Sequence, residues 1–296
     1  MWELSLARFI TGIVFLAIAA IKDIRTRRVE DELWIIMGII AMILLAIELA
    51  LIREVRWEFL LIFIPIGVIF SEAFIDRPPI FSGDGFNLLV LGYFSLPSIT
   101  LVYMAMVLSG ELLFWALTMI LVVMLFSFLL YFLYILHGGA DAKAVITLAI
   151  LLPFYPEIPG ITFRTISGEL LSIMEVFFPF TLIVLLNASL LVLIFPLFSF
   201  LFNIFKGDID LPKMFFGYKK RVESLEGSFV WPMEYYEDGV LKSELLPRSG
   251  TEEKIESLRS HGAEEVWATP KIPFIVPMLF GFVLSFMIGN PVMYVL

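Results

Sequence analysis

The chain has 296 residues, of which 60% are hydrophobic and 17% are charged, and its formal net charge at pH 7 is −9. Soluble domains are typically about 45–50% apolar and about 25% charged, so this composition excludes an ordinary water-soluble protein, and it also excludes intrinsic disorder. The mean hydropathy of +0.96 indicates a polytopic membrane protein, and the acidic balance argues against nucleic-acid binding. Since the sequence contains no cysteine, disulfides, thiol nucleophiles and Cys-based zinc sites are excluded.

Apolar runs long enough to cross a bilayer core of about 30 Å recur along the chain. They predict an all-α membrane protein with about eight transmembrane helices, at residues 4–22, 33–52, 57–75, 86–107, 110–136, 141–155, 173–205 and 272–294. A charged segment precedes the last of these spans, and its turn residues predict a small cytoplasmic domain, α+β or irregular, with a short helix near 251–260. The predicted organisation is a membrane helical domain at 1–205 (spans one to seven), the cytoplasmic domain at 206–271 and the last transmembrane helix within 272–296.

The distribution of Lys and Arg predicts the orientation, because cytoplasmic loops are enriched in these residues. With the N-terminus outside, sixteen of the twenty Lys and Arg lie on one side of the membrane, but ten of these lie in the long segment 206–271 and are discounted, because large loops follow the rule poorly. Four of the other six directly follow the first span. The opposite side holds Arg8, Arg53, Arg56 and Arg164. We therefore expect a multi-pass protein of the cell membrane whose basic side faces the cytoplasm.

Ionisable residues at or within membrane spans are candidates for function. Asp23 ends the first span and Asp141 begins the sixth, and both are predicted at the cytoplasmic face, together with Asp76 and Asp84. Two carboxylates held close together share one proton, so that one acts as a general base toward water and the other as a general acid toward an amide, as in aspartic proteases. Spacing alone leaves the pairing open, because Asp84 rivals Asp141 as the partner, and each acid also fits a solvated helix end.

Small residues surround Asp141 in the stretch LHGGADAKAVITL. Gly138, Gly139, Ala140 and Ala142 give the backbone there almost no side-chain bulk. Small residues let membrane helices approach closely, and glycine permits non-helical backbone where a substrate strand must come near. The pattern is consistent with a carboxylate placed at a close contact between two elements.

Two motifs resemble those of the prepilin peptidase family. The stretch IKDIRTRRVEDELW at 21–34 resembles its first-Asp motif, and HGGADAKAVITLAILLP at 137–153 resembles its Gly-x-Gly-Asp motif with the following Lys and a closing Pro. LLNASLL at 185–191 and the tail EEVWATPKIPFIVPMLFGF at 264–282 are similar to the archaeal branch, the preflagellin (prearchaellin) peptidases. The sequence departs from the motif at Ala140, where the family has Gly, and again at Ala142.

The resemblance implies an aspartic endopeptidase that removes class III signal peptides from archaellin or type IV pilin precursors at the cytoplasmic face. It implies that Asp23 and Asp141 are the catalytic pair, and that Lys143 binds substrate or supports the site. Gly138 and Gly139 are implied as backbone elements of the loop before the second acid.

The resemblance also sets expectations for partners. We expect Asp76 and Asp84 to attract the basic residues that precede the cleavage site in such substrates. The implied partners are these precursors and the lipid bilayer. No cofactor, metal or nucleic acid is implied.

Three other functions are compatible with the same residues. A presenilin-like intramembrane protease shares the Gly-x-Gly-Asp chemistry, but it has a mid-chain Tyr-Asp helix and a Pro-Ala-Leu element that are not evident here. An ion- or proton-coupled transporter is expected to carry its acids near the bilayer midplane, on broken helices. A catalytically silent relative that serves as an assembly scaffold is the third.

Overall fold

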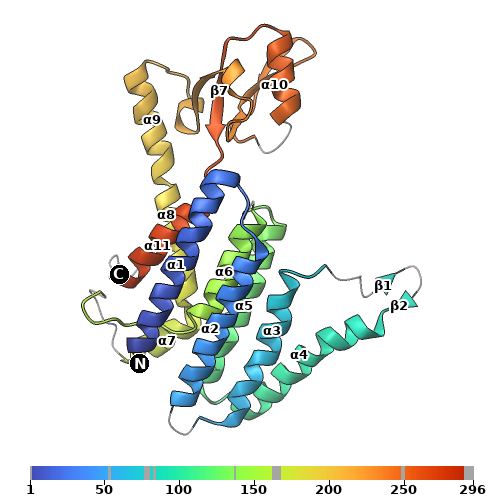
Figure 1. The fold of residues 1–296 in the computed structure, drawn as a ribbon, viewed down its shortest axis with the longest axis vertical. Helices are drawn as coiled ribbons and strands as arrows, with labels where there is room; N and C mark the ends of the chain where they lie inside the picture. Colours follow the sequence, from blue (N-terminus) through green and yellow to red (C-terminus); the bar gives the residue numbers. More distant parts are fainter. Residues whose placement is uncertain are drawn as a thin grey trace. The chain divides into compact units, whose positions relative to one another are not determined.

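The computed structural model describes residues 2–52, 55–76, 81–82, 85–136, 138–161, 168–247 and 251–289. The chain divides into two compact units, of which the first comprises Met1–Ser189 with Phe274–Leu296 and the second comprises Leu190–Pro273. The first unit is a bundle of helices, and the second contains a small sheet (Figure 1). A mostly helical protein with a small sheet domain is therefore confirmed.

The first unit is built almost entirely from helices. In chain order they are α1 (Trp2–Thr26), α2 (Asp31–Leu51), the 3₁₀ helix η1 (Trp57–Ile62), α3 (Phe63–Glu72), α4 (Leu88–Leu108), α5 (Leu112–Phe132), α6 (Gly139–Leu151), α7 (Gly168–Phe177), α8 (Phe180–Val192) and α11 (Ile275–Ile288). A two-residue hairpin of β1 (Phe81–Ser82) and β2 (Gly85–Phe86) precedes α4.

The lengths of these helices bear on the predicted number of membrane spans. Within the described residues, five helices are long and apolar enough to cross a membrane: α1, α2, α4, α5 and the stretch Phe180–Lys206, which contains α8 and α9 (Ile194–Lys206). The count of eight is not confirmed, because the apolar runs at 57–75, 141–155 and 272–294 contain the shorter helices α3, α6 and α11. The 13 residues of α6 extend for about 20 Å, less than the hydrocarbon core of about 30 Å.

The apolar run predicted as one span at 173–205 is divided into helices α7, α8 and α9. Proline explains the breaks, because it lacks an N–H and its ring clashes with the carbonyl four residues earlier. Pro179 precedes the first residue of α8, where no helical N–H is required. Pro196 lies in the first turn of α9, and the carbonyl with which it would clash belongs to Val192, the last residue of α8.

Helix α6 is the core of the first unit, where it packs against α1, α2, α3 and α5 (Figure 1). All residues of α6 from Ala144 to Leu151 are buried, which is typical of a helix that is apolar on every side. Two hydroxyl groups from neighbouring helices also donate to its backbone. Ser127 of α5 bonds the carbonyl of Ala142 at 3.0 Å, and Thr181 of α8 bonds that of Leu148 at 3.1 Å.

Glycine allows the helices of the first unit to approach closely at three contacts. A Cβ at Gly38 of α2 would lie 2.2 Å from the ring of Phe70 in α3. A Cβ at Gly12 of α1 would lie 2.2 Å from the ring of Phe282 in α11. A Cβ at Gly281 of α11 would lie 2.6 Å from the backbone nitrogen of Ala188 in α8. Small residues at such contacts are typical of helix packing in membranes.

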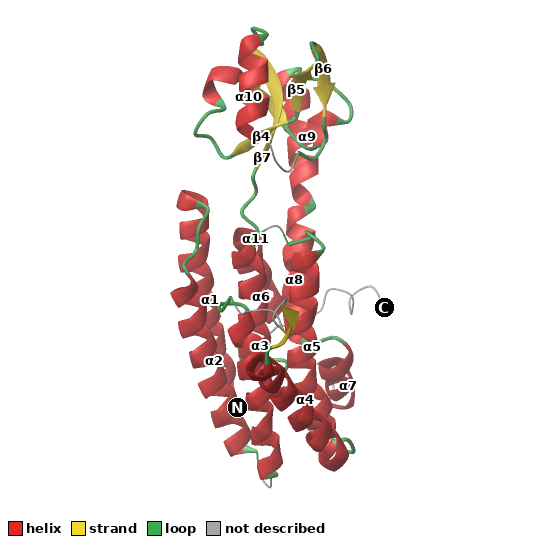
Figure 2. Cartoon of the chain, turned by 90° about the vertical axis from the view of Figure 1, so that its right-hand side faces the viewer, coloured by secondary structure: helices red, strands yellow, loops and turns green. Residues whose placement is uncertain are grey.

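The second unit contains a three-stranded antiparallel sheet in the order β3-β7-β4, a separate β5–β6 hairpin and the helices α9 and α10 (Figure 2). After α9, its elements are η2 (Lys213–Phe215), β3 (Tyr218–Arg221), η3 (Val222–Ser224), β4 (Val230–Pro232), β5 (Glu234–Glu237), β6 (Val240–Ser243), α10 (Thr251–Ser260) and β7 (Glu265–Pro270). Helix α10 occupies the position of the predicted short helix. Its Ile255 and Leu258 complete a small apolar core with Val222, Val230 and Val266.

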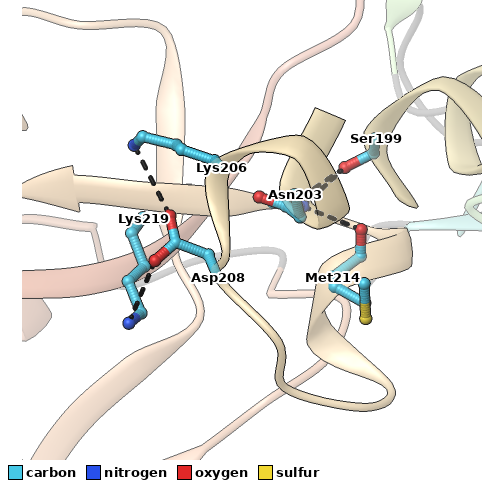
Figure 3. A network of polar contacts seen from close by, with 7 residues as sticks. Ser199, Asn203, Lys206, Asp208, Met214 and Lys219 are labelled. Atoms are coloured by element: carbon cyan, nitrogen blue, oxygen red, sulfur yellow. Dashed lines mark hydrogen bonds and ion pairs between the residues drawn. The ribbon is translucent and has the colours of Figure 1, made fainter. Parts of the chain in front are cut away.

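This unit begins at Leu190, earlier than the predicted boundary at 206, because α9 is joined to it by hydrogen bonds (Figure 3). The side-chain amide of Asn203 donates to the carbonyl groups of Met214 at 2.9 Å and Gly217 at 2.7 Å. The Ser199 hydroxyl donates to the same Gly217 carbonyl at 3.0 Å. Since buried polar groups must be paired, these bonds fix the polar face of α9 against η2.

An ion pair is buried between α1 and α2 in the first unit. The guanidinium Nη2 of Arg8 lies 2.5 Å from Oε2 of Glu48, and the two side chains are 4% and 8% exposed. Removing such charges from water costs several kcal/mol per ion, so each is tolerated only beside its partner. The pair therefore fixes α1 against α2.

We expect Glu48→Gln to lower the free energy of unfolding by roughly 3–5 kcal/mol, because it leaves the Arg8 charge buried and unpaired. The double variant Arg8→Met/Glu48→Met removes both charges and is expected to recover most of that loss. Thermal unfolding of the detergent-solubilised protein measures the difference. Arg56→Met, which disrupts an exposed ion pair with Glu58, is the control. Equal unfolding midpoints for Glu48→Gln and Arg56→Met would contradict this expectation.

Candidate functional site

Asp23 lies in the last turns of α1, just before the helix ends at Thr26. The next residue, Arg27, adopts a left-handed conformation with φ of 56°, and its N–H donates to the Asp23 carbonyl at 3.0 Å. A left-handed residue after the last helical turn is a common helix C-cap, usually made by glycine. The cap ends α1 close to Asp23 and leads the chain into α2.

Asp141 is the third residue of α6, and Gly138 is the N-cap of that helix. The carbonyl of Gly138 accepts hydrogen bonds from the N–H groups of Asp141 at 3.1 Å and Ala142 at 3.3 Å. The Asp141 carboxylate in turn accepts a hydrogen bond from the Gly138 backbone. This is one half of a capping box, in which an acidic third residue bonds the N-cap N–H. The carboxylate is thereby held at the beginning of α6.

The two glycines before Asp141 differ in their surroundings. A Cβ at Gly138 would lie 2.9 Å from Oδ2 of Asp141, whereas a Cβ at Gly139 would have no neighbour within 4 Å. Ala140 and Ala142 are both within α6 and neither has a positive φ. Because alanine is the best helix former, the two departures from the family motif fit the local backbone.

Asp23 lies on α1 and Asp141 on α6, and these two helices contact each other. Asp23 and Asp141 lie close enough for their charges to interact, and the guanidinium of Arg27 interacts with both carboxylates. All three side chains are half-buried. A cation beside two like charges offsets part of their repulsion, so Arg27 belongs to the electrostatic surroundings of this pair.

Lys143 forms its described ion pair with Asp31 of α2 rather than with Asp141. Its Nζ lies 2.5 Å from Oδ1 of Asp31 and 5.1 Å from the centre of the Phe74 ring, which follows α3. The Lys143 side chain is 21% exposed and that of Asp31 is 45% exposed. Lys143 therefore connects the beginning of α6 to the beginning of α2.

Of the other two predicted acids, the structure describes only Asp76. Asp76 is exposed beyond the end of α3, and no described interaction joins it to Asp23 or Asp141. Asp84 lies outside the described residues.

Sequence reasoning missed three residues that contact the pair or the first turns of α6. In the sequence, Arg27 is one of several neighbouring basic residues. Only the structure distinguishes it from Arg25 and Arg28, because Arg27 has the left-handed backbone conformation that caps α1. Asp31 had a usable signal, because it is an acid in the first turn of a predicted helix. Ser127 was a polar residue within a long apolar run, which is itself a signal in a membrane helix.

Two interacting carboxylates at one helix contact are able to share a proton and to act as base and acid in a hydrolysis. In the part of the chain that the structure describes, no three acidic, His or Cys side chains are grouped as metal ligands.

Comparisons with known proteins find one matching family model and two similar proteins. The family model described as Archaeal Peptidase A24 C-terminus Type II matches residues 210–290. The chain is 25% identical to the preflagellin peptidase of Methanocaldococcus jannaschii over 291 residues, which are 96% of this chain and 94% of the relative. It is 24% identical to the preflagellin peptidase of Methanococcus voltae over 166 residues, which are 54% of this chain and 66% of that relative.

Proposed function

Because the chain belongs to the archaeal preflagellin peptidase family, we propose that it is a membrane aspartic endopeptidase that removes class III signal peptides from archaellin or type IV pilin precursors at the cytoplasmic face. That the chain is a peptidase and a membrane protein follows from the family and from its five long apolar helices. We propose in addition that the mechanism is aspartic and that cleavage takes place on the cytoplasmic side of the membrane.

The interaction between Asp23 and Asp141 is the observation that carries the mechanism. They lie on helices far apart in the sequence, α1 and α6, which contact each other. One carboxylate removes a proton from water, which attacks the scissile carbonyl, and the other donates a proton to the departing amine. The protons are exchanged between the two carboxyl groups, so no metal or organic cofactor takes part.

The substrate enters this reaction from the bilayer. Its hydrophobic segment lies in the membrane against the helices of the first unit, and its charged leader extends to the aspartates. The scissile bond precedes the hydrophobic segment, so the site has to lie near the end of the bundle, and Asp23 and Asp141 are near the end of α1 and the beginning of α6.

The orientation rests on the charge distribution. Lys22, Arg25, Arg27 and Arg28 cluster at the same end of α1 as Asp23. Since Lys and Arg are enriched on the cytoplasmic side, the aspartates face the cytoplasm, where the precursor's leader is made available after synthesis.

Asp23→Asn and Asp141→Asn are each expected to lower kcat by roughly 10²–10⁴-fold, because the amide preserves the shape of the side chain but exchanges no proton. The measurement is cleavage of a preflagellin precursor in membranes, with substrate and product separated by size. Glu32→Gln, an exposed acid in the first turn of α2, is the matched control and is expected to cleave normally.

The outcomes separate the alternatives. Cleavage by both Asp variants at the wild-type rate would show that another pair of groups carries the chemistry. Failure of the wild type to cleave any archaellin or pilin precursor would favour a transporter or a silent scaffold.

We also infer that Asp76 and Asp84 attract the basic leader of the substrate. The double variant Asp76→Asn/Asp84→Asn is then expected to raise KM several-fold with kcat little changed, because opposite charges accelerate encounter without entering the chemical step. The increase should shrink at high salt. An unchanged KM at low salt would remove both residues from the proposal.

Gly138→Ala is expected to lower kcat roughly ten- to a hundredfold, because its Cβ would lie 2.9 Å from Oδ2 of Asp141 and displace that carboxylate. The backbone of Gly138, at φ −104° and ψ 131°, accepts alanine, so the thermal unfolding midpoint should change little. Gly139→Ala is the matched control, since a Cβ there meets nothing within 4 Å. Equal rates for the two variants would mean that the space beside Asp141 is not required.

A further inference from the structure

We propose that Asp31 is a positioning residue of the peptidase, which holds Asp141 opposite Asp23 through its ion pair with Lys143. This inference rests on the proposed function of the two aspartates. It assigns Lys143 to the support of the site, rather than to the binding of substrate.

The first step is the direction in which the side chains of α6 point. Successive residues of an α-helix are separated by about 100° around the axis, so Asp141 and Lys143 are about 200° apart. Asp141 interacts with Asp23 of α1, whereas Lys143 contacts Asp31 of α2 and the Phe74 ring. The two side chains thus engage opposite sides of α6.

The second step is what the ion pair constrains. Helix α6 is packed on all sides by apolar contacts, which are non-directional and allow small rotations and shifts along the axis. The hydrogen-bonded ion pair between Lys143 Nζ and Asp31 Oδ1, at 2.5 Å, is directional. A cation–π contact with Phe74, which follows α3, also holds the Lys143 ammonium in place. A rotation of α6 that moved Asp141 away from Asp23 would also break this contact.

The third step is that Asp23 and Asp31 lie on either side of the same short connection, between α1 and α2. Asp23 lies at the end of α1, and Asp31 begins α2 after a four-residue connection. Two interactions hold that connection against α1: Lys22 forms an ion pair with Glu30, and the Thr26 hydroxyl donates to the Arg28 carbonyl at 3.0 Å. The segment that places Asp23 therefore also places the residue that anchors α6.

The pair is partly exposed, so its contribution to overall stability is expected to be small. Its effect should instead appear in catalysis, where a displacement of about 1 Å can cost roughly a hundredfold in rate. This separates a positioning role from a merely structural one.

The test compares Asp31→Asn, Lys143→Met and the charge exchange Asp31→Lys/Lys143→Asp in cleavage of a preflagellin precursor. We expect each single variant to lower kcat roughly ten- to a hundredfold with KM nearly unchanged, and the exchange to recover most of the loss, since it restores one long and one short side chain of opposite charge. Glu32→Gln, in the same turn of α2, is the matched control.

Three results would overturn the inference. Wild-type kcat in both single variants would show that the ion pair is not needed. A raised KM in Lys143→Met, with Asp31→Asn unaffected and no recovery in the exchange, would assign Lys143 to substrate binding. A parallel fall in kcat and in the thermal unfolding midpoint would indicate general destabilisation. In each case, inactive Asp23→Asn and Asp141→Asn variants would leave the proposed function itself intact.

Discussion

The burial of α6 is the constraint on which the rest of the first unit depends. A helix that is apolar around its whole circumference must be enclosed, and α1, α2, α3 and α5 enclose this one. That packing places the beginning of α6 beside the end of α1, which is where Asp141 meets Asp23. Apolar packing alone does not define how α6 is rotated about its axis. The polar contacts of Ser127 and Lys143 are important because they define this rotation.

Polar interactions fix the α1–α2 hairpin at both ends. The Arg8–Glu48 pair is buried near the beginning of α1 and the end of α2, about 22 Å along α1 from Asp23. The ordered connection with its Lys22–Glu30 pair closes the other end. A hairpin held at two separated points resists sliding of one helix past the other. Asp23 and Asp31 lie at the same end of this hairpin, on either side of its connection.

Much of this arrangement could be predicted from local sequence features. Long apolar runs predicted α1, α2, α4 and α5, and the charged segment predicted the small domain that contains the sheet. The motifs around Asp23 and Asp141 predicted a catalytic pair, and that role stays a prediction. Hydropathy could not distinguish the short α6 from a full span, because both read as apolar runs. The Lys143–Asp31 contact was also out of reach, since it depends on how two helices are rotated against each other. The attachment of α9 through Asn203 depends in the same way on side-chain contacts with residues beyond the apolar run.

The shortness of α6 has a consequence for the lipid around the protein. A helix about 20 Å long within a hydrocarbon layer of about 30 Å leaves one or both ends below the headgroups. Asp141 is near one of those ends, so the local thickness of the bilayer sets the depth to which water must penetrate to reach its carboxylate. We therefore expect lipids with longer acyl chains to deepen that path and lipids with shorter chains to shorten it. The hydration of Asp141 is then expected to depend on the thickness of the surrounding bilayer as well as on the protein.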